Sequence, residues 1–150
     1  TMTDRGPDSA GIAIYGSDVD SKGKLTVQSD TPDVDFGNLA ADLSAHVSGN
    51  VTSSQKDTHT VLEMQADQLA TARSALKEIR PNVRVMSVGD TLEIYKEVGL
   101  PKDVAQRFEV AKMSGSHGIG HTRMATESAV TTMGAHPFNT GSDQCLVHNG

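Results

Sequence analysis

The sequence predicts an α+β protein, and three observations lead to this class. Segments with the pattern of β-strands follow one another in pairs, and the segments with helical periodicity stand apart from them. The last 37 residues hold six of the 14 glycines, which is typical of strands, loops and close backbone approaches. Paired strands favour antiparallel sheets over repeating βαβ units. The 150 residues have the length of one domain, and we assign 1–150 to part of a single domain.

The first third of the chain predicts two strands, a short helix and a loop. Residues 9–16 (SAGIAIYG) are small and then apolar, as in a buried strand, and 25–29 form a second strand that we expect to pair with the first as a hairpin. Residues 38–47 place apolar side chains at i, i+4 and i+8, which predicts a helix. The polar, Ser/Thr-rich residues 48–58 predict a loop.

The middle of the chain alternates between strands and helices. Residues 59–64 predict a strand, and 66–80 form the clearest helix, which Pro81 ends. Residues 83–88 and 92–98 predict two strands of a hairpin that turns at Gly89-Asp90. Pro101 suits a first helical turn and opens a helix over 101–113.

Composition excludes several classes of protein. Thirteen Lys and Arg against 19 Asp and Glu leave a net charge of −6, which argues against nucleic acid or an anionic membrane as the main partner. No apolar run reaches the length that spans a bilayer. A single cysteine excludes a disulfide framework and indicates a reducing compartment, for which we expect the cytoplasm.

One strand-like run ends in an arginine that suits an anion. In GIGHTRMATE (118–127) the strand ends at Arg123, and small hydroxyl residues follow it. The guanidinium group is a planar fork of donors that matches a carboxylate, and backbone N–H groups after it can complete an anion site. The alternative is an ordinary structural or surface ion pair.

The last strand-like run delivers Asn149 and Gly150. An Asn-Gly pair is typical of a hairpin turn. The alternative is an oxyanion hole, because the asparagine amide and the glycine N–H can both donate to one developing negative oxygen.

Histidine, cysteine and the first residue raise three further hypotheses. A zinc site is one, from His117, His121, His136, Cys145 and His148, although Gly118 and Gly120 favour a strand over the helix that would join the first two. Cys145 partnered by His148 is a candidate nucleophile, but it lies in an apolar run where cysteine is typically a small hydrophobe. Thr1 as an N-terminal nucleophile has only its position in favour.

Four motifs occur in a specific order along the chain: RGPDSAG (5–11), HTRMAT (121–126), HPF (136–138) and HNG (148–150). Together they resemble the class II glutamine amidotransferases, which are N-terminal-nucleophile hydrolases. The sequences GIGHTRMATESAVTTMGAHPF (118–138) and DQCLVHNG (143–150) look most like the glutaminase subunit of glutamate-synthase-like or N-methylglutamate-synthase-like systems. The resemblance is strongest over the first dozen and the last forty residues.

This resemblance implies a four-layer αββα sandwich that is incomplete at both ends. The implied activity is hydrolysis of glutamine to glutamate and ammonia, with the ammonia passed to an acceptor on a glutamate-synthase-like partner subunit. No cofactor and no metal are implied for this chain. The alternative is a non-catalytic glutamine-binding or regulatory module.

The resemblance also implies roles for individual residues. Arg123 would bind the α-carboxylate of glutamine, helped by Thr126 and Glu127, and Asn149 with Gly150 would form the oxyanion hole. Arg5 would order the network near the nucleophile. His136 and His148 would give structural support.

The chain departs from the family pattern at both ends. The family nucleophile is a mature N-terminal cysteine shortly before the RGPDSAG turn, and the acidic residue that binds the substrate α-amine follows the HNG motif. This sequence runs from Thr1 to Gly150, so we expect the nucleophile and that acid to lie outside it and the fragment to be inactive by itself. Cys145 does not match the nucleophile.

Overall fold

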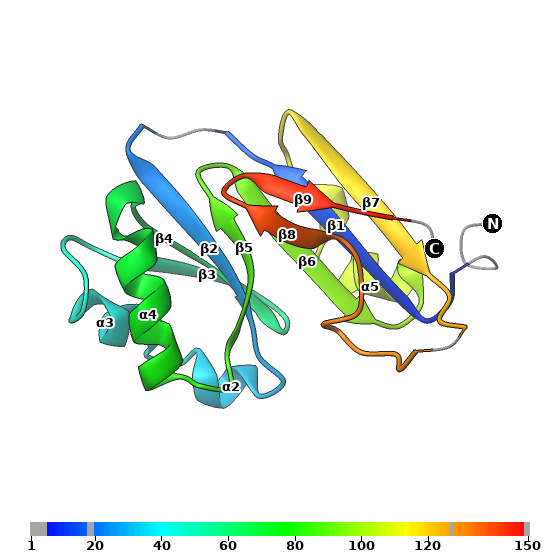
Figure 1. Ribbon diagram of the computed structural model, residues 1–150, viewed down its shortest axis with the longest axis horizontal. Coiled ribbons are helices and arrows are strands. Elements are labelled where there is room, and N and C mark those ends of the chain that lie inside the picture. The colour runs from blue at the N-terminus through cyan, green and yellow to red at the C-terminus, as the bar shows by residue number, and fades with distance from the viewer. Residues whose placement is uncertain (1–5, 18–19, 127, 149–150) are drawn as a thin grey trace.

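The computed structural model describes residues 6–17, 20–126 and 128–148, and these confirm the α+β class. Figure 1 shows two antiparallel sheets side by side, with a hairpin lying in front of them. One sheet has the order β6 (Leu92–Val98), β1 (Ser9–Tyr15), β7 (His117–Arg123). The other has the order β3 (Thr52–Lys56), β4 (His59–Gln65), β2 (Lys22–Gln28), β5 (Arg84–Gly89). The hairpin consists of β8 (Phe138–Gly141) and β9 (Gln144–Leu146).

The helices are short and cover the sheets from outside. They are α2 (Pro32–Asp35), α3 (Leu39–Ser44), α4 (Leu69–Ile79) and α5 (Pro101–Arg107), with 3₁₀ turns η1 (Ala66–Gln68) and η2 (Val110–Lys112). Helices α3 and α4 lie against the β3-β4-β2-β5 sheet (Figure 1), and their buried leucines share one apolar cluster with Leu25, Val27 and Leu62. None of the helices that the structure describes has the length and apolar character that crossing a bilayer requires.

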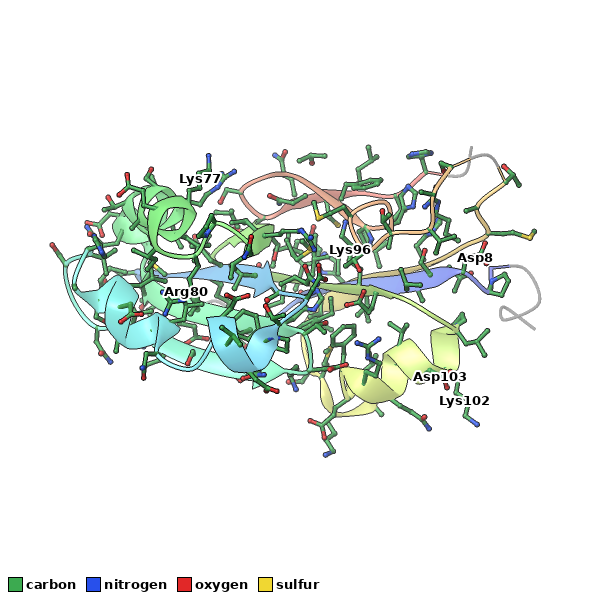
Figure 2. The ribbon with its side chains drawn as sticks, turned by 90° about the horizontal axis from the view of Figure 1, so that it is seen from below. Asp8, Lys77, Arg80, Lys96, Lys102 and Asp103 are labelled. Carbon is green, nitrogen blue, oxygen red and sulfur yellow. The ribbon has the colours of Figure 1, made fainter. Side chains whose placement is uncertain are left out.

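The β6-β1-β7 sheet is covered on both faces. Ala10 on β1 packs with Tyr95, Val104 and Phe108 on the face that α5 covers. Ala13 packs with Met86, Leu92 and Ile94 on the opposite face, where Cys145 of β9 joins them. Figure 2 shows this arrangement from the side, with α5 below the sheet and the β8–β9 hairpin above it. The alternation of side chains along β1 therefore separates two different environments.

The predicted hairpin between 9–16 and 25–29 is wrong, although both strands exist. β1 pairs with β6 and β7, whereas β2 pairs with β4 and β5 in the other sheet. β2 is a central strand whose residues are nearly all buried, and helices cover one of its faces. The local pattern indicates a strand, but the burial of both faces decides its partners.

The second predicted hairpin, between 83–88 and 92–98, is also wrong, because the two strands do not pair with each other. β5 and β6 occupy these positions but belong to different sheets. The turn between them is bound by Asp143 from the β8–β9 hairpin, whose carboxylate accepts hydrogen bonds from the backbone N–H groups of Asp90, Thr91 and Leu92, each at 2.9 Å. A contact across 51–53 residues therefore shapes a turn that a local dipeptide signal assigned to a hairpin.

Other boundaries differ from the sequence-based expectation. The predicted loop 48–58 contains strand β3, which the pattern hid because its five residues are polar and mostly exposed at the edge of the sheet. The predicted helix 101–113 ends at Arg107, because Glu109 adopts the left-handed conformation (φ 54°) before η2. Helix 38–47 is confirmed over the shorter span of α3. Strands at 9–16 and 59–64 and the helix at 66–80 are confirmed by β1, β4 and η1 with α4.

Candidate functional site

The register of the β6-β1-β7 sheet brings polar side chains together at one end. On β1, Ser9 lies opposite Arg123 of β7, and Gly11 lies opposite both His121 of β7 and Lys96 of β6. Directly opposite residues in antiparallel strands point to the same face. Ser9, Lys96, His121 and Arg123 therefore share the face that the β8–β9 hairpin covers.

The loop before β8 crosses this face and adds His136. The carbonyl oxygen of His136 comes so close to β1 that a Cβ atom on Gly11 would lie 2.2 Å from it. Only glycine leaves room for this approach. The His136 ring then lies 4.4 Å from the ring of His121 and 4.6 Å from that of His148, measured between centroids. Three histidines from distant parts of the chain thus meet beside Arg123.

Several buried polar atoms in this cluster have no hydrogen-bond partner among the described residues. They are Ser9 Oγ, His121 Nδ1, Arg123 Nη1, His136 Nδ1 and His136 Nε2. Ser9 is fully buried and His136 is 6% exposed. Because buried polar groups are nearly always paired in folded proteins, a concentration of unpaired ones indicates a place where a polar ligand or water binds.

Arg123 is held in position by its own strand end. Its Nη2 donates to Ser128 Oγ, and its carbonyl oxygen accepts from the N–H of Asp8 at 3.1 Å. The Asp8 carboxylate in turn accepts from the N–H of Ala125 at 2.7 Å. Asp8 and the segment after β7 are therefore tied together, and Nη1 of the guanidinium group has no hydrogen-bond partner among the described residues.

The electrostatics of the cluster suit an anion. Burial, together with the nearby His121, His148, Arg123 and Lys96, lowers the pKa of His136 to about 4. Burial also lowers the pKa of Lys96, to about 8. At neutral pH the site therefore holds a neutral His136 between two cations. No carboxylate of the described residues forms an ion pair with either Arg123 or Lys96.

The structure locates only part of the predicted site. Arg123 lies in the cluster, and Thr126 follows it in an exposed bend. The remaining predicted residues, Arg5, Glu127, Asn149 and Gly150, lie outside the described residues. Sequence reasoning missed Ser9 and Lys96. A signal for Lys96 was available, because alternation along LEIYKEV places it on the same face as Leu92 and Ile94, where an apolar residue is expected.

Cys145 and His117 lie at the other end of the sheet. Cys145 Sγ is 3.4 Å from the hydroxyl of Tyr15, and the His117 ring stacks on the Tyr15 ring at 4.2 Å. Tyr15 ends the strand that Ser9 begins, and six steps of roughly 3.3 Å separate their Cα positions by about 20 Å. Cys145 is therefore remote from Arg123. His148 packs on His136, and among the described residues no hydrogen bond joins His148 to Cys145.

The histidines do not assemble a metal site in the part of the chain that the structure describes. Across residues 6–17, 20–126 and 128–148, no group of three metal-ligating side chains is arranged to hold an ion. His117 and His121 lie on one strand, and four residues of extended chain separate them by about 13 Å.

A separate cavity opens on the opposite face of the same sheet. It measures about 310 Å³ and lies between β1, β7 and α5, with mainly apolar walls that include Ile12, Pro101, Val104 and Val110. Apolar walls offer no charge to an anionic group. The polar cluster beside Arg123 is therefore the better candidate site.

Comparison with known proteins gives similarity to proteins with glutamine amidotransferase names. No model of a known protein family matches the chain. The chain is 64% identical over 151 residues to the glutamine amidotransferase-like protein GlxB of Rhizobium meliloti (strain 1021), an alignment that covers 100% of this chain and 50% of that protein. This chain therefore spans about half the length of that relative.

Shorter similarities reach glutamine–fructose-6-phosphate aminotransferases. The chain is 43% identical over 63 residues to the enzyme of Streptococcus pyogenes serotype M6, covering 41% of this chain and 10% of the enzyme. It is 44% identical over 72 residues to the enzyme of Methanosarcina acetivorans, covering 45% of this chain and 11% of the enzyme. The chain is thus similar to proteins named for glutamine-dependent transfer.

Proposed function

We propose that this chain forms part of the glutaminase half of a class II glutamine amidotransferase. The reaction is hydrolysis of glutamine to glutamate and ammonia, and the ammonia passes to an acceptor on a partner synthase subunit of the glutamate-synthase-like kind. The observation that carries the proposal is Arg123, whose guanidinium group lies at a strand end among buried polar atoms that have no hydrogen-bond partner in the part of the chain that the structure describes. The similarity to glutamine amidotransferase-like proteins supports the same substrate.

In this proposal Arg123 binds the α-carboxylate of glutamine through its two-donor fork. Thr126 and Glu127 assist it, and the unpaired atoms of Ser9 and His121 meet other polar groups of the substrate. Ser9, His121 and Arg123 lie on paired strands, which favours a fixed substrate orientation. Asn149 and Gly150 form the oxyanion hole, and Arg5 orders the network around the nucleophile.

The proposed chemistry is a covalent displacement at the side-chain amide. A cysteine thiolate attacks the amide carbon while its α-amine takes the thiol proton and passes it to the leaving nitrogen. The C–N bond breaks, ammonia leaves, and water hydrolyses the thioester to glutamate. We assign the nucleophile to a residue outside Thr1–Gly150, since the thiol of Cys145 is hydrogen-bonded to the Tyr15 hydroxyl at the end of β1 that lies away from Arg123.

Further properties belong to the same proposal. The four-layer αββα arrangement is supported by antiparallel sheets with α3 and α4 on one and α5 on the other. The chemistry needs no cofactor or metal in this chain. The cytoplasm is the proposed location, and the single cysteine and the reducing conditions that it indicates support it.

A second function has one observation in its favour. The thiol that the structure describes is remote from Arg123, which suits a module that binds glutamine without hydrolysing it. Ammonia release separates the two functions, because both require glutamine binding.

The test uses the natural protein in its full length, and it measures glutamine binding by calorimetry and ammonia release by a coupled assay. We expect both, with Arg123→Met raising KM for glutamine by about a hundredfold, which corresponds to the loss of a charge-assisted carboxylate contact of about 2–3 kcal/mol. Cys145→Ala serves as the control and should stay within threefold of the wild type. Binding without ammonia release would favour the second function, and no binding at all would overturn both.

A further inference from the structure

Lys96 is a buried lysine at a strand position where an apolar residue is expected. It is 3% exposed. Its Nζ donates to the carbonyl oxygen of Ala135 at 2.8 Å and to that of Met133 at 3.4 Å. The same Nζ lies 4.6 Å from the centre of the Phe138 ring. Three contacts of one ammonium group thus all fall on the segment 133–138.

The environment of Lys96 is unusual for a buried cation. Buried lysines are normally paired with a carboxylate, because burial disfavours the charged form. No such partner occurs among the described residues, and the neighbouring Glu97 points to the opposite face of β6. The ammonium group is instead satisfied by two carbonyl dipoles and an aromatic face. Because burying the Lys96 ammonium group costs desolvation free energy, we expect this side chain to have a structural or functional role.

Lys96 is the first of three residues that lie directly opposite one another across the β6-β1-β7 sheet. Lys96, Gly11 and His121 are opposite one another on β6, β1 and β7. From Ala135, held by Lys96, the chain passes over Gly11 with the carbonyl group of His136 and brings the His136 ring against His121. The position of His136 therefore depends on where Lys96 holds the preceding residue.

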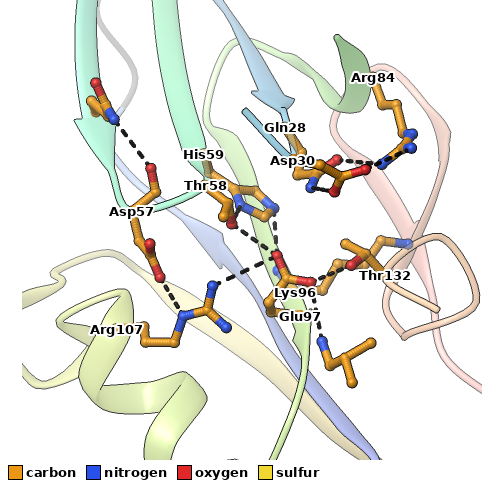
Figure 3. Close-up of polar contacts among 12 residues, drawn as sticks. Gln28, Asp30, Asp57, Thr58, His59, Arg84, Lys96, Glu97, Arg107 and Thr132 are labelled. Atoms are coloured by element: carbon orange, nitrogen blue, oxygen red, sulfur yellow. Dashed lines mark hydrogen bonds and ion pairs between the residues drawn. The ribbon is translucent and has the colours of Figure 1, made fainter. Parts of the chain in front are cut away.

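The same loop is bound a second time by the next residue of β6. Thr132 Oγ1 donates to the Glu97 carboxylate, which also accepts from Thr58 Oγ1 at 2.8 Å (Figure 3). Lys96 and Glu97 point to opposite faces of β6. The loop residues 132–135 are therefore hydrogen-bonded on both faces of the sheet, at Thr132 by Glu97 and at Met133 and Ala135 by Lys96. Glu97 orients the approach of the loop, and Lys96 sets its position over the site.

We propose that Lys96 is a positioning residue for the candidate site. Its ammonium group fixes the carbonyl oxygens of Met133 and Ala135, and so it holds His136 above Gly11, against His121 and next to Arg123. Lys96 itself does not touch the substrate. The positioning of His136 stands on the contacts above, whereas its consequence for glutamine rests on the proposed function.

Three variants of the full-length natural protein test this role. Lys96→Met keeps the length of the stem but removes the charge and the donors, and Lys96→Arg keeps both. Lys24→Met is the matched control, because Lys24 on β2 is also a largely buried strand lysine, but it has a carboxylate partner, Glu93, at 2.9 Å. The measurements are the imidazole NMR signals of His136 and His121, KM and kcat for glutamine, and the unfolding midpoint.

We expect Lys96→Met to shift the His136 and His121 signals and to raise KM about tenfold, with kcat changed less than threefold. Lys96→Arg should restore both readouts to within threefold of the wild type, and Lys24→Met should leave both unchanged. Wild-type histidine signals and KM in Lys96→Met, with only the unfolding midpoint lowered, would overturn the proposal.

Two further outcomes still separate the role of Lys96 from the proposed function: failure of Lys96→Met to fold, and absence of ammonia release by the wild-type protein. If Lys96→Met does not fold, Lys96→Gln replaces it, since glutamine keeps N–H donors without the charge, and unchanged histidine signals in that variant would overturn the role. If the wild-type protein releases no ammonia from glutamine, the proposed function fails. The histidine signals of the variants still decide whether Lys96 positions the loop.

Discussion

Gly11 and His136 are in such close contact that any side chain on Gly11 would displace the loop above it. A Cβ atom there would lie 2.2 Å from the carbonyl oxygen of His136 and 2.6 Å from Cβ of Lys96. The 125 positions that separate the two residues in the sequence are thus bridged by one backbone approach, and this approach closes the polar cluster beside Arg123.

Gly11→Ala should therefore destabilise the protein. Overpacking a tight interior contact costs about 1–3 kcal/mol, and here the clash involves backbone, which yields less than a side chain does. Urea unfolding measures the change. Gly120→Ala is the matched control on the neighbouring strand, because its Cβ would meet nothing closer than 4.0 Å. Equal stability of the two variants would contradict the close approach.

His59 should make the protein sensitive to acid. Burial, together with the positive charges of Arg107 and Lys96, lowers the pKa of His59 to about 3. Because the unfolded chain binds the proton near pH 6.5 and the folded protein only near pH 3, the unfolded state holds more protons between these values. Stability therefore falls as pH decreases through this window, by roughly 4–5 kcal/mol in total at about 1.4 kcal/mol per pKa unit.

The measurement is urea unfolding at several pH values from 7 down to 4. His59→Leu should show a flatter decline, since it removes the group that takes up the proton. His46 is exposed, and His46→Ala should decline as the wild type does. A wild-type slope in His59→Leu would show that another group governs acid unfolding.

Asp143 should be important for the attachment of the β8–β9 hairpin. Burial raises the pKa of its carboxyl group, but hydrogen bonds from the backbone N–H groups of Asp90, Thr91 and Leu92 outweigh this effect and lower the pKa. Asp143→Ala leaves those donors without their acceptor, and we expect a loss of about 1–3 kcal/mol in unfolding free energy.

Hydrogen exchange of the Asp90, Thr91 and Leu92 amides provides the second measurement for Asp143→Ala, and these amides should exchange faster. The matched control is Asp90→Ala, because the Asp90 side chain is exposed and its backbone N–H makes the contact. Unchanged protection of the three amides in Asp143→Ala would contradict the prediction.

Glu97 should stabilise the junction between the loop, β6 and the β3–β4 turn. Its carboxylate accepts from Thr132 Oγ1, from Thr58 Oγ1 at 2.8 Å and from the Val98 N–H at 3.1 Å (Figure 3). Glu97→Gln keeps the shape but weakens these charge-assisted bonds, and we expect a loss of about 1–3 kcal/mol.

Thermal unfolding is the measurement for Glu97→Gln, and Glu78→Gln on the exposed side of α4 is its control. Only the Glu97 variant should unfold at a lower temperature. If Thr132→Val in addition to Glu97→Gln costs as much as the two single changes together, the two residues are not coupled, and the loop is held by other contacts.

Local patterns determined much of the secondary structure and one residue of the site. Helix α4 follows from its apolar spacing and from Pro81, and strands β1, β4, β5 and β6 follow from runs of apolar and β-branched residues. Arg123 was identifiable because it ends a strand and hydroxyl residues follow it. These features depend on neighbours in the sequence, which is the range over which such patterns carry information.

Only the tertiary structure decided which strands pair and which polar groups meet. β1 and β2 belong to different sheets because each buries both faces against long-range partners, and no local signal specifies those partners. Lys96, Gly11 and His121 form one row only through the register of three strands, and His136 joins them through a loop that crosses the sheet. The sequence by itself thus determined the elements and a candidate anion-binding arginine. Packing across distant segments decided the site around it.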